Sequence, residues 1–336
     1  MSARRATPRP LPAPLHPTDP AGAALQHHLH TAARAFLEQD RLVRHQVPGS
    51  VERLRGYARR IRDALRACAP LVEPRWGEQL VVELRWLERA LTAEHDREVA
   101  LARLLRVLDA VPDDPGSVRA RHLLERRLSR ELAEARVATL NALSSSRYRL
   151  LVDRLTLVLH ELPGTSIAGR SCTEVLPALA AMAFRRLARA ARRLDADHGA
   201  YEEWRHARVL ARCGRCAAEV CADVFGEPAR AFAGQLGRLV DVLGVHEDAT
   251  KAAEAARAAA NTPRIAPQTM FTLGFLYATE RAAALNARRE FRHAWSEATK
   301  KKWRRWLDET EPGGNAGSAH PWALVELKDC EPDDEL

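Results

Sequence analysis

Apolar residues that recur every three or four positions run through most of this chain, and this spacing restricts its fold more than any other feature. The recurrence matches the α-helical turn of about 3.6 residues, whereas a half-buried strand alternates with a period of two. Prolines fall mostly between the periodic stretches, where helices end. The predicted helices cover residues 21–40, 50–69, 75–92, 94–110, 116–143, 147–161, 173–197, 200–224, 228–243, 246–259 and 268–306. Aromatic residues form only 5% of the chain, fewer than a sheet protein usually carries. The sequence therefore predicts an all-α fold.

Two of these helices carry rows of arginines with the same spacing. Each row follows a first residue, Glu52 in one helix and Arg205 in the other, by three, seven and ten positions. The rows consist of Arg55, Arg59 and Arg62, with Arg66 one turn further, and of Arg208, Arg212 and Arg215. At about 100° per residue, each row occupies one sector of its helix, beside the apolar sector. We therefore expect the arginines to border the buried surface.

The likeness between the two halves extends beyond the arginine rows. Arg62 is followed 34 residues later by Asp96, and Arg215 is followed 33 residues later by Asp248. This repeat predicts a duplicated unit, hence two similar bundles related by an approximate internal twofold axis. Pro163-Gly164 is a turn signal where the halves would join. The predicted organisation is a Pro-rich disordered tail (1–20), a first bundle (21–162), a second bundle (163–307) and an acidic flexible tail (308–336).

The charge of the chain favours an anionic partner. Lysine and arginine number 52 against 44 aspartates and glutamates, a net charge of +8. The last 29 residues hold nine carboxylates and one lysine, so residues 1–307 carry +16. A third row, Arg185, Arg189 and Arg192, shares one face of the helix over 173–197, and the three rows could line one groove. Aligned guanidinium groups repel one another unless an anion offsets them. The alternative is a solvated helix face stabilised by nearby carboxylates.

Several other classes of protein fit the sequence less well. No run of about 18 apolar residues is present, and the first 20 residues carry prolines in place of a signal-peptide core, which predicts a cytoplasmic protein without a membrane span. The pair Cys213 and Cys216 lacks a second ligand pair, so we expect reduced thiols and no metal. Neither a Gly-rich phosphate loop nor a paired acid/base site is evident, which predicts a protein without catalysis or cofactor.

On these residues the sequence resembles the CHAD family, the conserved histidine α-helical domain. The family motif is a histidine followed by arginine or lysine at plus three, seven, eight and ten, once in each half. The first copy here keeps Arg55, Arg59, Arg60 and Arg62, and the second keeps Arg208, Arg212 and Arg215. The family also has Leu-Gly shortly before an aspartate, as in Leu243-Gly244 and Asp248. The resemblance covers about residues 21–307.

The resemblance implies two similar four-helix bundles around a basic channel that binds inorganic polyphosphate without catalysis, as in proteins of polyphosphate granules. The polyphosphate-binding residues that it implies, together with the arginine rows, are Arg55, Arg59, Arg60, Arg62, Arg66, Arg185, Arg189, Arg192, Arg205, Arg208, Arg212 and Arg215. The name-giving histidines are replaced, by Glu52 in the first copy and by Arg205 in the second, with His206 displaced by one position. Cys213 and Cys216 also replace residues that the family motif usually has. The replacements predict a weakened or altered site.

Two further functions remain open at this point. A groove that binds one polyanion can bind another, so RNA is a competing partner, with Tyr57, Tyr148 and Trp204 as candidates to stack on bases. A structural adaptor with a degenerate site is the third reading. The acidic tail is expected to compete with the ligand for the basic groove. Neither the oligomeric state nor the preferred length of a polyphosphate chain follows from the sequence.

Overall fold

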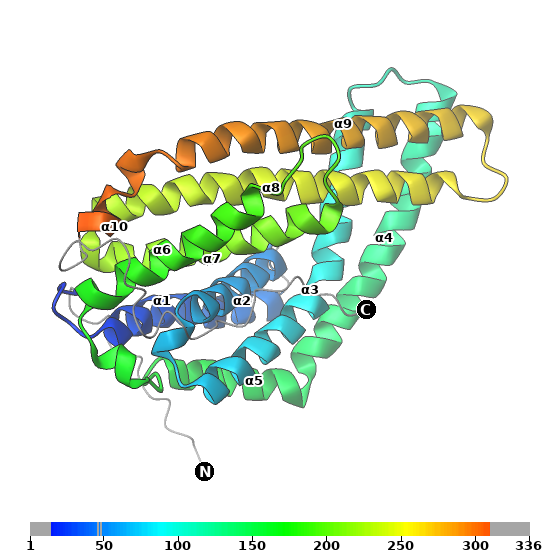
Figure 1. Ribbon diagram of the computed structural model, residues 1–336. Helices are drawn as coiled ribbons and strands as arrows, with labels where there is room; N and C mark the ends of the chain where they lie inside the picture. Colours follow the sequence, from blue (N-terminus) through cyan, green and yellow to red (C-terminus); the bar gives the residue numbers. More distant parts are fainter. Residues whose placement is uncertain (1–14, 46, 48, 310–336) are drawn as a thin grey trace, which may run out of the picture.

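The computed structural model describes residues 15–45, 47 and 49–309, and this part of the chain is helical and has no β-strand beyond two isolated bridges. The all-α prediction is confirmed (Figure 1). The α-helices are α1 (Ala21–Arg44), α2 (Ser50–Ala67), α3 (Pro74–Leu108), α4 (Pro115–Ser144), α5 (Ser146–Val158), α6 (Cys172–Ala191), α7 (Tyr201–Phe225), α8 (Glu227–Ala260), α9 (Pro267–Ala298) and α10 (Arg305–Glu309). Three short 3-10 turns, at Ala69–Leu71, Ser166–Gly169 and Lys301–Trp303, join some of them. Most of both predicted tails lies outside the described residues.

Two of the helices are twice as long as predicted. The breaks expected near residue 93 and near Gly244 are wrong, since α3 and α8 run through them with 35 and 34 residues. Thr92 and Ala93 contain no helix breaker, and Gly244 keeps a helical backbone without positive φ. A Cβ at Gly244 would lie 3.1 Å from the guanidinium of Arg208, so this glycine makes room for an arginine. In contrast, the last long helix, predicted to reach residue 306, ends at Ala298.

The start of α4 illustrates how local sequence sets the helix ends. Asp114 Oδ1 accepts hydrogen bonds from the backbone N–H groups of Gly116, at 2.6 Å, and Ser117, at 2.9 Å. Ser117 Oγ accepts one in return from the N–H of Asp114, at 3.0 Å. Pro115 occupies the first helical position, where no N–H is needed. Such a capping box stabilises a helix by about 1 kcal/mol, and α4 begins one residue before the predicted position 116.

Two apolar cores hold the helices together, and each takes residues from both halves of the chain. The larger core lies among α1, α2, α5, α6, α7 and the neighbouring parts of α3, α8 and α9. The smaller core joins the C-terminal parts of α3 and α8 to the N-terminal parts of α4 and α9. These four segments project beyond the body as an arm (Figure 1). A division at residue 163 therefore does not separate two cores, and the internal twofold symmetry stays a prediction. None of the helices in residues 15–309 is long and apolar enough to cross a membrane.

Candidate functional site

The arginine rows of α2 and α7 meet between the long helices α3 and α8. Helix α2 packs on both α3 and α7, and α8 packs on both α3 and α7, so side chains from all four helices converge. We call this group the central cluster. It comprises Arg55, Arg59, Arg62 and Asp63 of α2, Glu88, His95 and Asp96 of α3, Arg208 and Arg212 of α7, and Glu247 and Lys251 of α8.

Asp63 connects the two arginine rows at the deeper end of the cluster. Its carboxylate accepts hydrogen bonds from Arg62, at 2.8 Å, and from Arg212 of the other half, at 2.9 Å. Arg62 is only 3% exposed and also donates to Glu88, at 2.8 Å. Burial alone would raise the pKa of Asp63, but Arg62 and Arg212 lower it to about 2. These arginines are therefore held in buried ion pairs.

A second ionic link ties α8 to the open end of the cluster. Lys251 Nζ lies 2.9 Å from Asp96 of α3 and 2.8 Å from Glu247 on its own helix. Glu247 also forms an ion pair with Arg208. Burial opposes ionisation of Glu247, yet Arg208 and Lys251 keep its pKa far below the usual range. Carboxylates from α3 and α8 thus occupy part of the cationic surface.

Arg55 and Arg59 are the cations that this network does not neutralise. Arg55 is 8% exposed and forms no hydrogen bond or ion pair with any described residue. The nearest carboxylate oxygen to Arg59 belongs to Glu88, at 3.6 Å, and the buried Nε of Arg59 has no hydrogen-bond partner. Burial, together with repulsion by Arg212 and Arg55, lowers the pKa of Arg59 to about 9. A positive charge is held here at a cost in free energy.

His95 completes the cluster and was not singled out by its sequence spacing. Burial, together with Arg55, Arg59, Lys251 and Arg208, lowers the pKa of its imidazole to about 3. The ring is therefore neutral near pH 7 and offers one hydrogen-bond donor and one acceptor. The signal that could have identified His95 is its position directly before Asp96, the aspartate that the repeat places 34 residues after Arg62. Lys251, three residues after Asp248, was also missed.

The charge balance of the central cluster favours an anion with several charges. Six cations face four carboxylates, an excess of two positive charges within the set defined above. Asp248 borders the set, and burial raises the pKa of its carboxyl group. Because the carboxylates are held closely by Arg62, Arg208, Arg212 and Lys251, a ligand can bind Arg55 without displacing a partner and meets only the 3.6 Å contact with Glu88 at Arg59. To bind Arg62, Arg208 or Arg212, the ligand must compete with the carboxylates that pair with them.

Two arginines of the family motif point to another part of the molecule. Arg60 and Arg215 share one carboxylate, Glu219, at 3.0 Å and 2.8 Å. They border a cleft of about 670 Å³ between α1, α2, α7 and α8. His28 lines the same cleft, and burial, with Arg60, lowers its pKa to about 4. The predicted set of site residues is therefore divided between the central cluster and this cleft.

The remaining predicted residues lie elsewhere. Arg66 faces α6 beside Arg186, and Arg205 pairs with Glu202 of its own helix at 3.4 Å. The third row is exposed and forms no ion pair with the central cluster: Arg185 and Arg189 lie on α6, and Arg192 follows its last residue. Glu52 is exposed, and its charge acts on Glu98, whose pKa is raised by burial and then by Glu94 and Glu52. The structure thus brings together parts of two rows, Arg55, Arg59 and Arg62 of α2 with Arg208 and Arg212 of α7, and leaves the third row apart.

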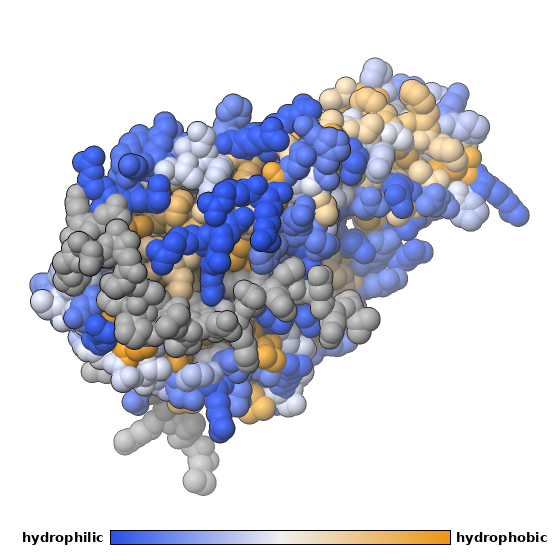
Figure 2. All heavy atoms as spheres, in the orientation of Figure 1, coloured by the Kyte–Doolittle hydropathy of each residue, from blue (hydrophilic) through white to orange (hydrophobic). Residues whose placement is uncertain are grey.

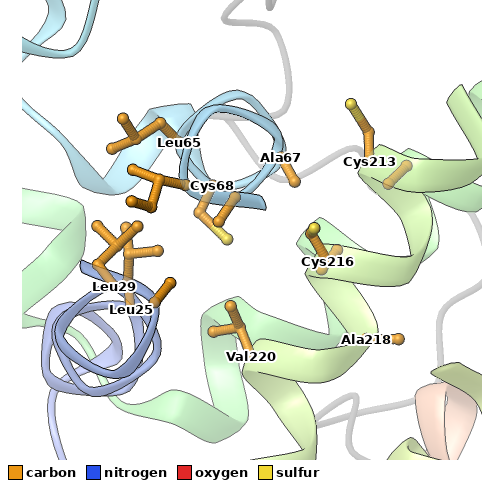
Figure 3. Close-up of a cluster of buried hydrophobic side chains, with 14 of the residues drawn as sticks. Leu25, Leu29, Leu65, Ala67, Cys68, Cys213, Cys216, Ala218 and Val220 are labelled. Carbon is orange, nitrogen blue, oxygen red and sulfur yellow. The ribbon is translucent and has the colours of Figure 1, made fainter. Parts of the chain in front are cut away.

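The described cysteines are buried thiols inside the larger core. Figure 3 shows Cys68 of the α2 end and Cys216 of α7 among Leu25, Leu29 and Val220. Burial raises the pKa of Cys216 well above its usual value, so the thiol stays protonated. No group of three or more His, Cys, Asp or Glu side chains within residues 15–309 is arranged to hold a metal ion.

With this geometry established, comparisons with known proteins assign the family. The family model of the CHAD domain matches residues 24–257. The chain is similar in structure to PptA from Streptomyces chartreusis, with 32% identity, a TM-score of 0.72, and coverage of 82% of this chain and 99% of that one. It also resembles the CHAD domain from the plant Ricinus communis, with 22% identity, a TM-score of 0.62, and coverage of 85% and 96%, which shows the fold alone. No curated protein matches it in sequence. The family model spans well over half of the chain, which therefore belongs to the CHAD family.

Proposed function

We propose that this protein binds inorganic polyphosphate at the central cluster, without catalysis, and that this binding attaches it to polyphosphate granules. The observation that carries the proposal is the pair Arg55 and Arg59, two largely buried guanidinium groups without adequate counterions. An unpaired buried charge costs several kcal/mol by order of magnitude. An anion that enters the cluster offsets this cost, so part of the binding energy is already stored in the unbound protein.

Inorganic polyphosphate fits the arrangement because its negative charges follow one another along a linear chain. One phosphate group can bind Arg55 and Arg59, and its neighbours then lie beside Arg208 and Arg212 of α7. Arginine suits this task because its planar fork of donors matches the oxygens of a phosphate. His95 can add one neutral hydrogen bond at the open end. The CHAD resemblance supports the same ligand.

A binding role without catalysis is supported by the protonation states of the cluster. A general acid or base works best when its pKa lies near the working pH. Here the pKa of His95 is about 3, the pKa of Asp63 is about 2, and that of Glu247 is strongly lowered by Arg208 and Lys251. None of these groups is suited to exchange protons near neutral pH.

RNA is the competing ligand, and the positions of the aromatic residues argue against it. Of the three candidate stacking residues, Tyr148 and Trp204 are 0% and 1% exposed, and the Tyr148 hydroxyl donates to Asp40. Tyr57 lines the cleft beside Arg60 rather than the central cluster. Stacking on bases usually accompanies binding of single-stranded nucleic acid. The cluster offers charge without such a surface.

The test is calorimetric titration with polyphosphate of the wild type and of two double variants. Arg55→Gln with Arg59→Gln removes the two charges that lack a close counterion. Arg126→Gln with Arg130→Gln removes two exposed charges of α4 as a matched control. At about 1.5 to 3 kcal/mol for each charged hydrogen bond, the first variant should lose at least 100-fold in affinity. The control should lose much less.

Salt and a competitor complete the test. If about six phosphates are neutralised, the slope of log affinity against log salt should be near −4 on the single-strand scale. Equal losses in both double variants, or a flat salt response, would contradict a defined polyphosphate site. RNA that displaces polyphosphate equally well at matched phosphate concentration would show a general polyanion site instead.

A further inference from the structure

The tip of the arm exposes large apolar side chains that the function of the central cluster does not use. Phe271 is 80% exposed, Phe275 47% and Met270 48%, all in the first turns of α9. Figure 2 shows apolar residues gathered on the surface at the end of the arm. Exposed patches of this kind usually mark a contact with another molecule.

The sequence of α9 shapes this patch into a flat strip. At about 100° per residue, Phe271, Gly274, Phe275, Ala278 and Ala282 fall within a sector of about 100° on one side of the helix. All five are exposed, and a Cβ built at Gly274 would meet no atom within 4 Å. The opposite side of α9 is buried in the smaller core through residues such as Leu273 and Leu276. The two rings therefore stand beside three small residues, where another helix can approach closely.

The order of large and small residues in the strip is complementary to itself. When a second α9 is laid antiparallel across it, one register places Phe271 opposite Ala278 and, at the same time, Gly274 opposite Phe275. Each ring then lies over a small residue of the other helix. The same register places Arg281 opposite Gln268, whose side-chain oxygen can accept a hydrogen bond from the guanidinium. No like charges meet among these pairs.

We propose that the protein forms a homodimer through the exposed strip of α9, with the twofold axis between Gly274 and Phe275. Such an interface is isologous, because each copy offers the same surface and receives the same surface. The two phenylalanines of the strip expose about 250 Å² if each offers about 200 Å² in full. A standard interface buries about 800 Å² on each partner. The dimer should therefore dissociate in the micromolar range, with a polar rim supplying the remaining area.

The dimer would carry one central cluster on each copy. Both clusters could bind one long polyanion, which raises the overall affinity without any new contact. The dimer interface itself does not depend on what the central cluster binds, so it can be tested without any ligand.

The first experiment measures mass against concentration by sedimentation equilibrium of the full chain. The wild type should pass from monomer to dimer between about 1 and 300 µM, whereas Phe271→Asp should stay monomeric because the charge would be buried at the interface. Leu157→Asp is the matched control, since Leu157 of α5 is 63% exposed and lies outside the arm. A wild type that stays monomeric at about 300 µM overturns the proposal. Equal effects of the two substitutions also overturn it.

The second experiment tests the register by disulfide trapping, with Cys330→Ser as background because the described cysteines are buried. Gly274→Cys lies next to the proposed axis and should crosslink to its own copy under mild oxidation. Ala282→Cys should not, because its two Cα atoms would be about 22 Å apart along antiparallel helices, far beyond disulfide reach. Crosslinking at 282 as fast as at 274 would refute the antiparallel register.

Discussion

Arg59 lies one turn before Arg62 on α2, yet the two arginines should respond in opposite ways to the same substitution. We predict that Arg59→Met stabilises the unbound protein, whereas Arg62→Met destabilises it. Methionine keeps much of the side-chain volume and removes the charge in both cases. Arg59 is repelled by its neighbours and has one distant carboxylate at 3.6 Å, while Arg62 makes two contacts of 2.8 Å with Asp63 and Glu88.

The size of each effect follows from these surroundings. Folding lowers the pKa of Arg59 from its ordinary value to about 9, which corresponds to a penalty of about 5 kcal/mol as an upper bound. Part of this gain is lost because Glu88 keeps only Arg62 as a close partner, so we expect a net stabilisation of about 1 to 2 kcal/mol. Arg62→Met leaves two buried carboxylates short of a partner and should cost about 3 to 5 kcal/mol.

The assay is urea unfolding followed by circular dichroism, with polyphosphate binding measured on the same samples. Arg59→Met should shift the urea midpoint upward and lower the affinity at least tenfold, because a charged hydrogen bond to phosphate contributes about 1.5 to 3 kcal/mol. Stability and binding would then change in opposite directions. If Arg59→Met destabilises the protein as much as Arg62→Met does, our inference that the charge of Arg59 lowers the stability of the unbound protein is wrong.

Two further predictions concern pH and the acidic tail. Burial lowers the pKa of His28 and of His246 to about 4, and the nearby Arg60 and Arg288 add to the effect. As pH falls from 6.5 towards 4, the unfolded chain therefore takes up protons that the folded chain does not. The free energy of unfolding, measured with urea, should therefore drop over this window by about 2 kcal/mol for each histidine. His28→Gln or His246→Gln should make the free energy of unfolding depend less on pH. An unchanged pH dependence in these variants would contradict the burial of the two rings. A chain ending at Glu309 should bind polyphosphate more tightly than the full chain at low salt, because residues 310–336, which carry a net charge of −6, no longer compete. The difference should shrink as salt is added. The cut follows Glu309 because Trp306 and Leu307 are buried, and equal or weaker binding by the shortened chain would exclude competition by the tail.

The helical periodicity and the arginine offsets could be read from the sequence because both are local. A turn of helix fixes which side chains share a face, so the convergence of Arg55 and Arg59 on one side of α2 follows from their spacing. The continuity of α8 was missed at Leu243-Gly244, where the prediction placed a break, and the break predicted in α3 near residue 93 has no such glycine. Gly244 is instead a helical residue that lets Arg208 approach closely. The sequence alone does not distinguish a glycine required for a close contact from one required for a turn.

The carboxylates of the site could not be predicted in the same way. The sequence predicted arginine rows that line one groove, but not which carboxylates would lie beside them. Arg62 finds Glu88 on α3, Arg208 finds Glu247 on α8, and Arg212 reaches Asp63 across 149 positions of sequence. These pairings depend on how the helices cross, and helix crossing is set by the packing of apolar side chains far from the charges.

If the central cluster binds polyphosphate as proposed, its own carboxylates would set a threshold for the length of the ligand. A single orthophosphate can occupy Arg55 and Arg59, but it has no linked second phosphate group that could replace Glu247 at Arg208 or Asp63 at Arg212. A linear polymer held at the first two arginines presents its next phosphate at a high local concentration, so each exchange becomes favourable only after the previous one. Cellular phosphate monomers would then leave the cluster nearly empty, and affinity would rise steeply over the first few linked units before it levels off. Glu247 and Asp63 would act as the part of the site that distinguishes a polymer from its monomer.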